Sequence, residues 1–414
     1  MKRMTRWLAA GLLLGVGLPG CGEPGPPPMR NAVLIVIDTL RSDALEHAET
    51  PAIDALAARG TLAPLSWSSE TWTGGSIVSL FSGRHARDHG WIQGFPGPRA
   101  SDWAPMPTLP DVPMLAEVLG EAGFHTAGYY ANHVLSWELG FERGFDRWEF
   151  VEDADLPEEA AVELRGWDDG ERHFLYLHFL GPHSPLDPSR SARRRWKLDA
   201  PRYSTRLTER VSDPARRARA IEQLRRAYWA VVEDTDARIG LLLRFLEPYM
   251  DETVIVLTSD HGEQLGERNR FGHGGYAYES LTRVPFIAVN TGELPGRFNN
   301  AIAADLLTRA LGVDHDWHLQ VELPELLIAE HVDGLALSPD GRVKAHWAVN
   351  GGLEVFDLSG YPEESPGLGE QAERLREARA RFERETERGE PGPARVSADP
   401  ELLEALRALG YVGD

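Results

Sequence analysis

Runs of apolar residues that end at acidic side chains constrain the fold of this chain more than any other feature. Residues 31–37 (NAVLIVI) form such a run directly before Asp38, and residues 253–257 lead into Asp260 and His261. A short run that is apolar at almost every position is typical of a strand buried on both faces of a parallel sheet. Each acidic side chain is therefore expected just beyond the C-terminal end of a buried strand.

Strand-like and helix-like segments alternate along most of the chain. Further strand-like runs occupy residues 125–131, 173–180 and 285–289. Helices are expected from cap residues and from helical spacing of apolar side chains at residues 50–60, 113–122 and 214–247. This alternation predicts an α/β fold with a mostly parallel central sheet and helices on both of its faces, an α/β/α sandwich.

The pattern changes after about residue 320, which predicts a main domain over residues 31–320 and a smaller C-terminal subdomain over residues 321–414. Residues 342–357 contain two short strand-like segments around Asn350-Gly351-Gly352, a sequence that favours a hairpin. Residues 369–389 are highly charged with few apolar positions, and they predict a helix that is solvated on most sides. A further small helix is expected at residues 400–409.

The first 30 residues are expected to direct and tether the protein and not to join its core. Basic side chains at residues 2–6 precede an apolar run, 7–19, that is too short to span a bilayer comfortably. A glycine before Cys21 makes the segment resemble the lipobox of bacterial lipoproteins, which predicts a signal peptide over residues 1–21 that ends at a lipidated Cys21. Residues 22–30 would be a Pro/Gly-rich tether.

This reading places the protein outside the cytoplasm, anchored by lipid to a bacterial membrane on its periplasmic or cell-surface side. An ordinary cleaved signal peptide or an uncleaved N-terminal anchor are the alternatives. The 64 acidic and 43 basic residues give a formal net charge of -21. Such a surface repels nucleic acid, which is therefore excluded as a partner. An anionic substrate would need local positive charge; the basic run at residues 190–197 is either a guide for it or a solvated segment.

Asp38, Asp260 and His261 are candidate metal ligands. In open α/β sheets ligands bind beyond the carboxyl ends of the strands, so the two carboxylates are expected on one rim. Two carboxylates and one imidazole suit a single divalent cation, Ca²⁺, Mg²⁺ or Mn²⁺, with zinc as the alternative. Taken one at a time, an aspartate after a strand is more often a helix cap or a turn residue.

Thr73 is the candidate nucleophile and a further metal contact. It stands before Gly74-Gly75 and a helical pattern, so it is expected just before a helix N-terminus, where backbone N–H groups favour an anion. The glycines are expected to let a tetrahedral anion approach the backbone closely. A cation at the Thr73 hydroxyl would lower its pKa and make an alkoxide available. The alternative is that Thr73 only caps the helix.

Two loop histidines complete the catalytic candidates. His183 follows the 173–180 run, and His273 lies in a glycine-flanked loop after the Asp260-His261 pair. Either could bind a substrate anion or protonate a leaving oxygen near neutral pH. His178, within the run itself, is expected to be a core histidine or to support the site from behind.

Several motifs stand in a fixed order along the chain: Ile35-Val36-Ile37-Asp38-Thr39-Leu40-Arg41, Ser79-Leu80-Phe81-Ser82-Gly83-Arg84, Pro182-His183, Thr258-Ser259-Asp260-His261-Gly262-Glu263 and Arg283-Val284-Pro285. In these motifs and their order the chain resembles the sulfatase family of the alkaline phosphatase superfamily. The resemblance implies an alkaline-phosphatase-like sandwich and a metal-dependent hydrolase of sulfate or phosphate esters in glycans, lipids or small molecules. It matches Asp38, Asp260 and His261 to metal ligands and His183 to a substrate-side histidine.

The nucleophile segment departs from the family. Sulfatases make a formylglycine from the first residue of a C/S-x-P-S-R motif, whereas this chain has an unmodified threonine, Thr73, at that place. Its single cysteine, Cys21, belongs to the expected anchor. An unmodified threonine nucleophile is more similar to the nucleophile of the superfamily's phosphoester-cleaving branch. The alternatives to a hydrolase are a phosphoryl-group transferase on envelope glycans or lipids and a non-catalytic binding protein.

Overall fold

The computed structural model describes residues 29–91, 108–167, 170–317, 326–331, 334–348, 352–360, 365–366, 371–386, 389 and 400–409. The expected signal peptide with Cys21, and most of the expected tether, lie outside the described residues. A search of the described helices for one long and apolar enough to cross a membrane finds none.

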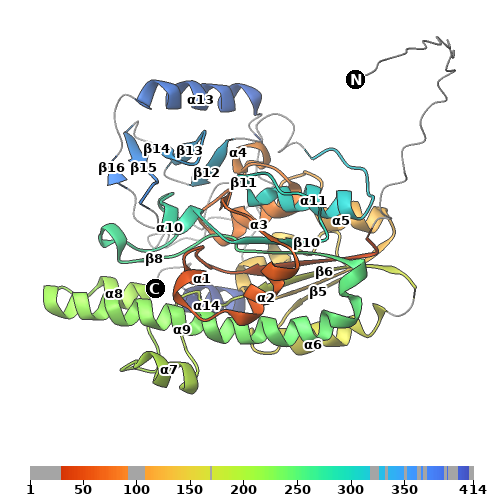
Figure 1. Cartoon of the computed structure of the whole chain (residues 1–414), viewed down its shortest axis with the longest axis horizontal. Helices are drawn as coiled ribbons and strands as arrows, with labels where there is room; N and C mark the ends of the chain where they lie inside the picture. The colour runs from red at the N-terminus through yellow and green to blue at the C-terminus, as the bar shows by residue number, and fades with distance from the viewer. Residues whose placement is uncertain are drawn as a thin grey trace, which may run out of the picture.

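A seven-stranded sheet forms the centre of the described molecule (Figure 1). Its order is β2 (Thr61–Leu62), β10 (Phe286–Val289), β7 (Thr253–Thr258), β1 (Asn31–Ile37), β6 (Arg172–Phe179), β4 (Phe124–Tyr130) and β5 (Arg147–Phe150). The five strands from β7 to β5 are parallel, whereas β10 and β2 pair antiparallel at one edge. The predicted mostly parallel sheet is confirmed.

One face of the sheet is covered by α2 (Pro51–Arg59), α6 (Leu156–Leu164) and α9 (Pro214–Leu246). The long helix α9 begins where the sequence signals a start, because Pro214 fits the first turn and the Asp213 carboxylate accepts a hydrogen bond from the backbone N–H of Arg216 at 2.8 Å. Alternate residues of β1 point into this layer: Val33, Ile35 and Ile37.

The other face is covered by α3 (Thr73–Ser82), α5 (Leu115–Glu121) and α11 (Ala303–Ala310). The remaining residues of the β1 apolar run, Ala32, Leu34 and Val36, pack here. Because β1 is fully buried on both faces, its near-continuous apolar run is explained without any alternation of polar residues. Figure 1 shows α9 below the sheet and α3, α5 and α11 above it.

A second sheet of five antiparallel strands lies beyond the central one. It comprises β12 (Leu327–His331), β13 (Gly334–Ser338), β14 (Val343–Ala348), β15 (Leu353–Asp357) and β16 (Ser365–Pro366). The β14–β15 pair confirms the expected hairpin, whereas β12 and β13 were not predicted. The expected domain boundary near residue 320 falls outside the described residues and stays a prediction.

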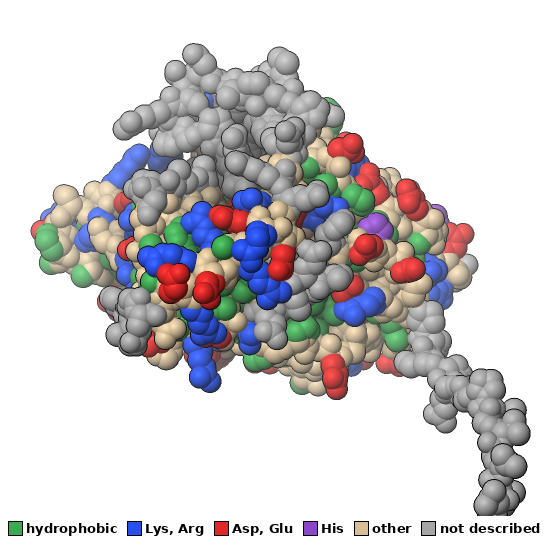
Figure 2. Space-filling view, turned by 90° about the horizontal axis from the view of Figure 1, so that it is seen from above, with side chains coloured by type: hydrophobic (Ala, Val, Ile, Leu, Met, Phe, Trp, Pro, Cys, Tyr) green, Lys and Arg blue, Asp and Glu red, His purple; other side chains and the backbone are tan. Residues whose placement is uncertain are grey.

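Helix α13 (Ala372–Glu385) covers this second sheet through Leu375 and Phe382. The rest of the helix is charged, with exposed pairs such as Arg379–Glu383 at 2.8 Å and Arg381–Glu385 at 3.0 Å. The mostly solvated helix predicted from its composition is therefore present. On the face seen from above in Figure 2, basic and acidic side chains are interspersed.

Shorter elements complete the described fold. They are α1 (Ala44–His47), β3 (Ser66–Trp67), α4 (Ala86–His89), α7 (Arg190–Trp196), α8 (Thr205–Glu209), β8 (Gln264–Leu265), β9 (Phe271–Gly272), α10 (Glu279–Thr282), β11 (Phe298–Asn299) and α14 (Pro400–Leu409). The basic run at residues 190–197 forms α7 and its cap, where Arg195 pairs with Glu233.

Candidate active site

The carboxyl ends of β1 and β7 bring two acidic side chains together. The two strands are parallel neighbours with Val36 opposite Thr258, so Asp38 and Asp260 emerge at the same edge of the sheet. Asp38, Asp260 and His261 each offer a ligand atom, and these atoms lie within 4.8 Å of one another. All three side chains are fully buried. The structure thus assembles the three residues that the sequence nominated as metal ligands.

The hydrogen bonds of this cluster leave one oxygen of each carboxylate available. Asp260 Oδ1 accepts from the backbone N–H groups of Thr39 at 3.1 Å and His261 at 2.8 Å, and Asp38 Oδ2 accepts from Asn132 Nδ2 at 2.6 Å. Asp38 Oδ1 and Asp260 Oδ2 are buried and have no hydrogen-bond partner among the described residues. Buried carboxylate oxygens without partners are costly unless they meet a cation, so the donor set fits a hard divalent metal ion.

The tautomer of His261 also fits a metal ligand. Its Nδ1 lies 2.9 Å from the carbonyl oxygen of Gly262, which can only accept, so Nδ1 carries the proton. Nε2 then keeps its lone pair, 3.5 Å from Asp260 Oδ2. Burial lowers the pKa of His261 well below its usual value and keeps the ring neutral. A backbone partner on the far nitrogen is how proteins commonly orient a metal-binding imidazole.

The pKa values of both carboxyl groups are raised in the protein without a bound cation. Burial raises the pKa of Asp38. Burial, reinforced by the charge of Asp38, raises the pKa of Asp260 to about 7. Two buried carboxylates side by side resist ionisation together, and a bound cation would reverse this effect by favouring both charged forms.

Thr73 lies at the edge of the cluster. Its Oγ1 is 3.3 Å from His261 Nε2 and 3.5 Å from Asp38 Oδ2. The residue is fully buried and is the first residue of α3, whose N-cap is Trp72. The sequence placed Thr73 just before the helix, so that expectation is wrong by one position. Thr73 therefore does not hold the N-cap position, and the Trp72 side chain, which does, makes no capping hydrogen bond.

The reason for the glycines after Thr73 also needs correction. A Cβ atom on Gly74 would lie 2.5 Å from the rings of both Trp72 and Trp91, and one on Gly75 would lie 2.9 Å from the Glu70 side chain. The space beside these glycines is filled by protein side chains. Packing alone explains the need for glycine here, and the expected approach of a tetrahedral anion to the backbone at these positions stays a prediction.

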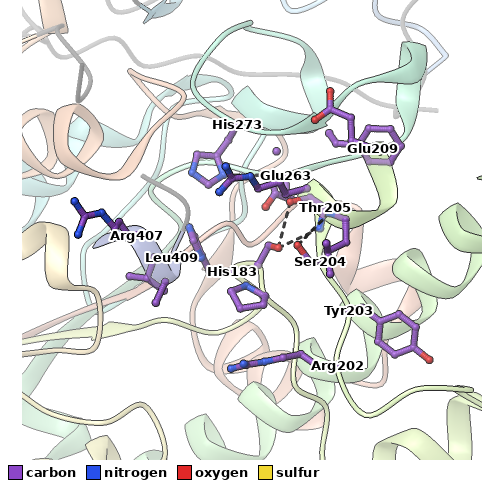
Figure 3. Close-up of a pocket in the computed structure, with 17 residues that line it drawn as sticks. His183, Arg202, Tyr203, Ser204, Thr205, Glu209, Glu263, His273, Arg407 and Leu409 are labelled. Atoms are coloured by element: carbon purple, nitrogen blue, oxygen red, sulfur yellow. Dashed lines mark hydrogen bonds and ion pairs between the residues drawn. The ribbon is translucent and has the colours of Figure 1, made fainter. Parts of the chain in front are cut away.

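His183 and His273 lie next to each other (Figure 3), and His273 also contacts the ring of His261. Their ring centroids are 5.2 Å apart, and the His273 ring lies 4.4 Å from that of His261. Burial lowers the pKa of His183 to about 4. Burial also disfavours the charged form of His273, but the Glu263 carboxylate, 3.2 Å from His273 Nδ1, outweighs it and the pKa of His273 is raised. His183 is therefore neutral near neutral pH, whereas Glu263 favours the charged form of His273.

Three supporting residues had no assigned role in the site. Glu263 polarises His273; its only sequence signal is its position three residues after Asp260. Asn132 lies beyond β4 on the same rim, 2.6 Å from Asp38 Oδ2 and 3.5 Å from Thr73 Oγ1. Tyr228, on α9, contacts the backbone beside Asp38. His178, expected as a core or supporting residue, lies 3.4 Å from Asp38 Oδ2 and contacts the Tyr176 hydroxyl at 2.9 Å.

The fold and this site define an α/β protein with a buried carboxylate–histidine cluster, of a composition that could hold a cation, at the strand ends of a mostly parallel sheet. The family model described as Sulfatase matches residues 30–312, and the chain belongs to this family, within the alkaline phosphatase superfamily.

Similar proteins span several activities. The chain is 24% identical to the N-acetylgalactosamine-6-sulfatase of Canis lupus familiaris over 75% of its length and 66% of that protein. It is 30% identical to an arylsulfatase of Clostridium perfringens over 33% of the chain and 31% of the relative. It is 28% identical to the multifunctional alkaline phosphatase superfamily protein PehA of Trinickia caryophylli over 35% of the chain and 34% of the relative. The match thus spans about a third of the length of the latter two relatives.

Solved structures share the fold at low sequence identity. BT4656, in complex with D-glucosamine-2-N,6-O-disulfate, has a TM-score of 0.67 and 16% identity over 87% of this chain and 97% of that one. The phosphonate monoester hydrolase of Agrobacterium radiobacter has a TM-score of 0.63 and 15% identity, and the match covers 86% of this chain and 96% of that one. These likenesses support the alkaline-phosphatase-like fold.

Proposed function

We propose that the protein is a metal-dependent hydrolase of sulfate esters that uses the unmodified Thr73 hydroxyl as its nucleophile. The observation that carries the proposal is the pair of buried carboxylate oxygens, on Asp38 and Asp260, that lack partners among the described residues beside that hydroxyl. Membership in the sulfatase family supports sulfate as the first candidate ester. The proposed substrate is a sulfated glycan or small molecule.

The residues that would hold the cation are Asp38, Asp260 and His261, with Thr73 beside them. A divalent cation supplies Lewis-acid polarisation and lowers the pKa of a nearby hydroxyl. Asn132 and the Thr39 backbone hold the carboxylates in place by hydrogen bonds to their other oxygens.

The reaction can be written with the chain's own groups. Thr73 Oγ1 forms a bond to the sulfur atom as the bond to the ester oxygen breaks, and Asp38 Oδ2, 3.5 Å away, accepts the hydroxyl proton. His273, charged because of Glu263, donates a proton to the departing oxygen. Neutral His273 then takes a proton from the attacking water as the bond between the sulfur atom and Thr73 Oγ1 breaks, and the proton on Asp38 returns to Thr73 Oγ1. His183 stays neutral and orients the substrate anion.

Phosphoryl chemistry is the second candidate, and the unmodified threonine favours it. A covalent ester on Thr73 can pass its group to water or to an acceptor alcohol, which would make the protein a hydrolase of phosphate esters or a phosphoryl-group transferase on envelope glycans or lipids. The relative PehA carries a multifunctional superfamily name, and the similar Agrobacterium structure is a phosphonate monoester hydrolase.

We also propose that Cys21 carries a lipid anchor outside the cytoplasm, on the basis of residues 1–21 alone. In a bacterial host, metabolic labelling with a palmitate analogue is expected to mark the wild-type protein and to be absent from Cys21→Ala. Labelling that persists in Cys21→Ala contradicts the anchor.

The proposed activity is tested by a screen of aryl sulfate, phosphate monoester and phosphate diester substrates with added Ca²⁺, Mg²⁺ or Mn²⁺. Wild-type protein is expected to hydrolyse at least one ester and Thr73→Ala to lose at least about 10³-fold in kcat, because the nucleophile is gone. Thr73→Ser keeps a hydroxyl and serves as the matched control, with partial activity expected. Undiminished turnover by Thr73→Ala excludes Thr73 as nucleophile, and no turnover of any ester favours a non-catalytic binding protein.

A further inference from the structure

A cavity of about 470 Å³ adjoins the candidate active site. Its wall includes His183, Glu263 and His273 on the side of the metal-ligand cluster. The rest of the wall comes from distant parts of the chain: the segment at 202–209 with α8, strand β9, and the C-terminal helix α14. The cavity is therefore placed to receive the part of a substrate that extends away from the scissile ester.

Basic side chains dominate the charge of this wall. Arg202, Arg206 and Arg407 line the cavity against two carboxylates, Glu209 and Glu263. Glu263 already pairs with His273 at 3.2 Å. The whole chain has a formal net charge of -21, whereas the three arginines make the wall of this cavity locally basic. Such a local charge attracts anions to this cavity.

Two of these arginines are uncommitted within the described part of the chain. Arg202 and Arg407 are exposed and have neither a side-chain hydrogen bond nor an ion pair with any described residue. Figure 3 shows Arg407 to the left of His183, Arg202 below it and His273 above it, so the two guanidinium-bearing side chains flank the histidine from different elements. The basic run on α7 contributes nothing to this wall.

The cavity also has apolar wall. Pro185, Leu207 and Phe271 line it, and Leu207 is 65% exposed although it is large and apolar. Apolar side chains of this kind pack against the flat face of a sugar or aromatic ring. Arginine forms paired hydrogen bonds with carboxylate, sulfate or phosphate oxygens. The wall thus combines a surface for a ring with donors for an anionic substituent.

We propose that this cavity binds a second anionic group, carried by the alcohol part of the substrate, through Arg202 and Arg407. The preferred substrate is then a ring-containing ester with two anionic groups. One is the ester that reacts at Thr73, and the other is a sulfate, phosphate or carboxylate that is left intact. This proposal rests on the proposed function and adds the substrate class. A substrate with one anionic group would use the metal-ligand cluster and His273 and leave both arginines without a partner.

The test compares two matched esters, 4-carboxyphenyl sulfate and the neutral analogue 4-carbamoylphenyl sulfate, or the corresponding phosphates if those are turned over. Wild-type protein is expected to prefer the carboxylate in kcat/KM, mainly through KM. Arg202→Gln and Arg407→Gln are each expected to reduce this preference about tenfold, the size of one charge-assisted hydrogen bond. The phenylene bis-sulfate and sulfate-phosphate analogues distinguish which second anion is preferred.

The ratio of the kcat/KM values for the two esters distinguishes a loss of binding from damage to the fold. A misfolded fraction lowers both kcat/KM values equally and leaves their ratio unchanged. Arg210→Gln is the matched control, since Arg210 is exposed, follows α8 and does not line the cavity. Its preference is expected to equal that of the wild type. No preference in the wild type, or a preference that survives in the Arg202→Gln/Arg407→Gln double variant, overturns the proposal.

A binding measurement separates this proposal from the proposed function. Calorimetric titration with benzene-1,4-disulfonate and benzenesulfonate needs no turnover. Tighter binding of the disulfonate that is lost in the double variant supports the cavity assignment even if no ester is hydrolysed. Turnover without discrimination in either assay leaves the hydrolase in place and rejects the second anion site.

Discussion

Tyr228 is predicted to position the turn that follows Asp38, a candidate metal ligand, although Tyr228 is far from this turn in sequence. Its hydroxyl donates to the carbonyl oxygen of Thr39 at 2.5 Å and accepts from the backbone N–H of Arg41 at 2.9 Å. Thr39 has a positive φ of 56°, which is unfavourable for a residue other than glycine. The same residue donates its N–H to Asp260. The two hydrogen bonds of Tyr228 therefore hold a strained turn that joins both carboxylates.

The perturbation is Tyr228→Phe, which removes one oxygen atom and leaves the volume almost unchanged. Because Tyr228 is fully buried, the Thr39 carbonyl and the Arg41 N–H lose their partner without gaining water. Each broken bond costs about 1–1.5 kcal/mol, so the free energy of unfolding is expected to fall by about 2–3 kcal/mol. If about half of this loss falls on the loop geometry, the affinity for a divalent cation falls about tenfold.

Urea unfolding and calorimetric cation titration measure the two effects separately. Tyr129→Phe is the control, since its hydroxyl contacts Glu163 at 3.0 Å and Arg147 at 3.1 Å, on side chains away from the cluster. That variant is expected to keep wild-type cation affinity. Wild-type stability and wild-type cation affinity in Tyr228→Phe refute the positioning role.

Three further predictions concern the charge, packing and domain contacts of the molecule. If charged His273 is the general acid, kcat is expected to fall as the pH rises through the raised pKa of His273. Glu263→Gln lowers the pKa of His273, so the fall in kcat in a pH–rate profile is expected to move to lower pH. An unchanged profile would contradict this role. Gly74→Ala is expected to lose about 1–3 kcal/mol of stability by thermal unfolding, because the new methyl group meets two indole rings, and full stability would contradict the contact. Lys344→Met is expected to cost about 3–5 kcal/mol in urea unfolding at neutral pH, since the buried Glu279 carboxyl group, 3.1 Å from Lys344, loses its cationic partner. No loss of stability would contradict a contribution of this ion pair to the fold.

The sequence predicted the central elements because their physical signals are local. The apolar run at β1 and the Thr50-Pro51 start of α2 each depend on a few neighbouring residues. The meeting of Asp38 with Asp260 also followed from the sequence, because parallel strands end at the same edge of a sheet. The antiparallel direction of β10 had no such signal, since an apolar run carries no direction.

The parts that were missed depend on contacts between distant segments. Strands β12 and β13 are short, and residues of both join clusters made by other elements, so their patterns alone were not distinctive. Asn132 reaches Asp38 only because β4 lies two strands from β1 in the sheet. The glycine at position 74 was singled out as a place for an anion to approach, whereas its contact with the Trp91 ring depends on the folded position of a residue outside α3.

The cation site is the central claim, and metal stoichiometry tests it most directly. Purified protein, stripped with chelator and reloaded, is expected to bind one divalent cation per chain by elemental analysis and calorimetry. Binding at 100 times the dissociation constant would add about 2.7 kcal/mol of stability, visible as a rise in Tm. Asp260→Asn is expected to lose the cation and the rise in Tm, whereas Asp199→Asn, at an exposed carboxylate outside the cluster, keeps both. Failure of the wild type to bind Ca²⁺, Mg²⁺, Mn²⁺ or Zn²⁺, or wild-type binding by Asp260→Asn, would contradict the account.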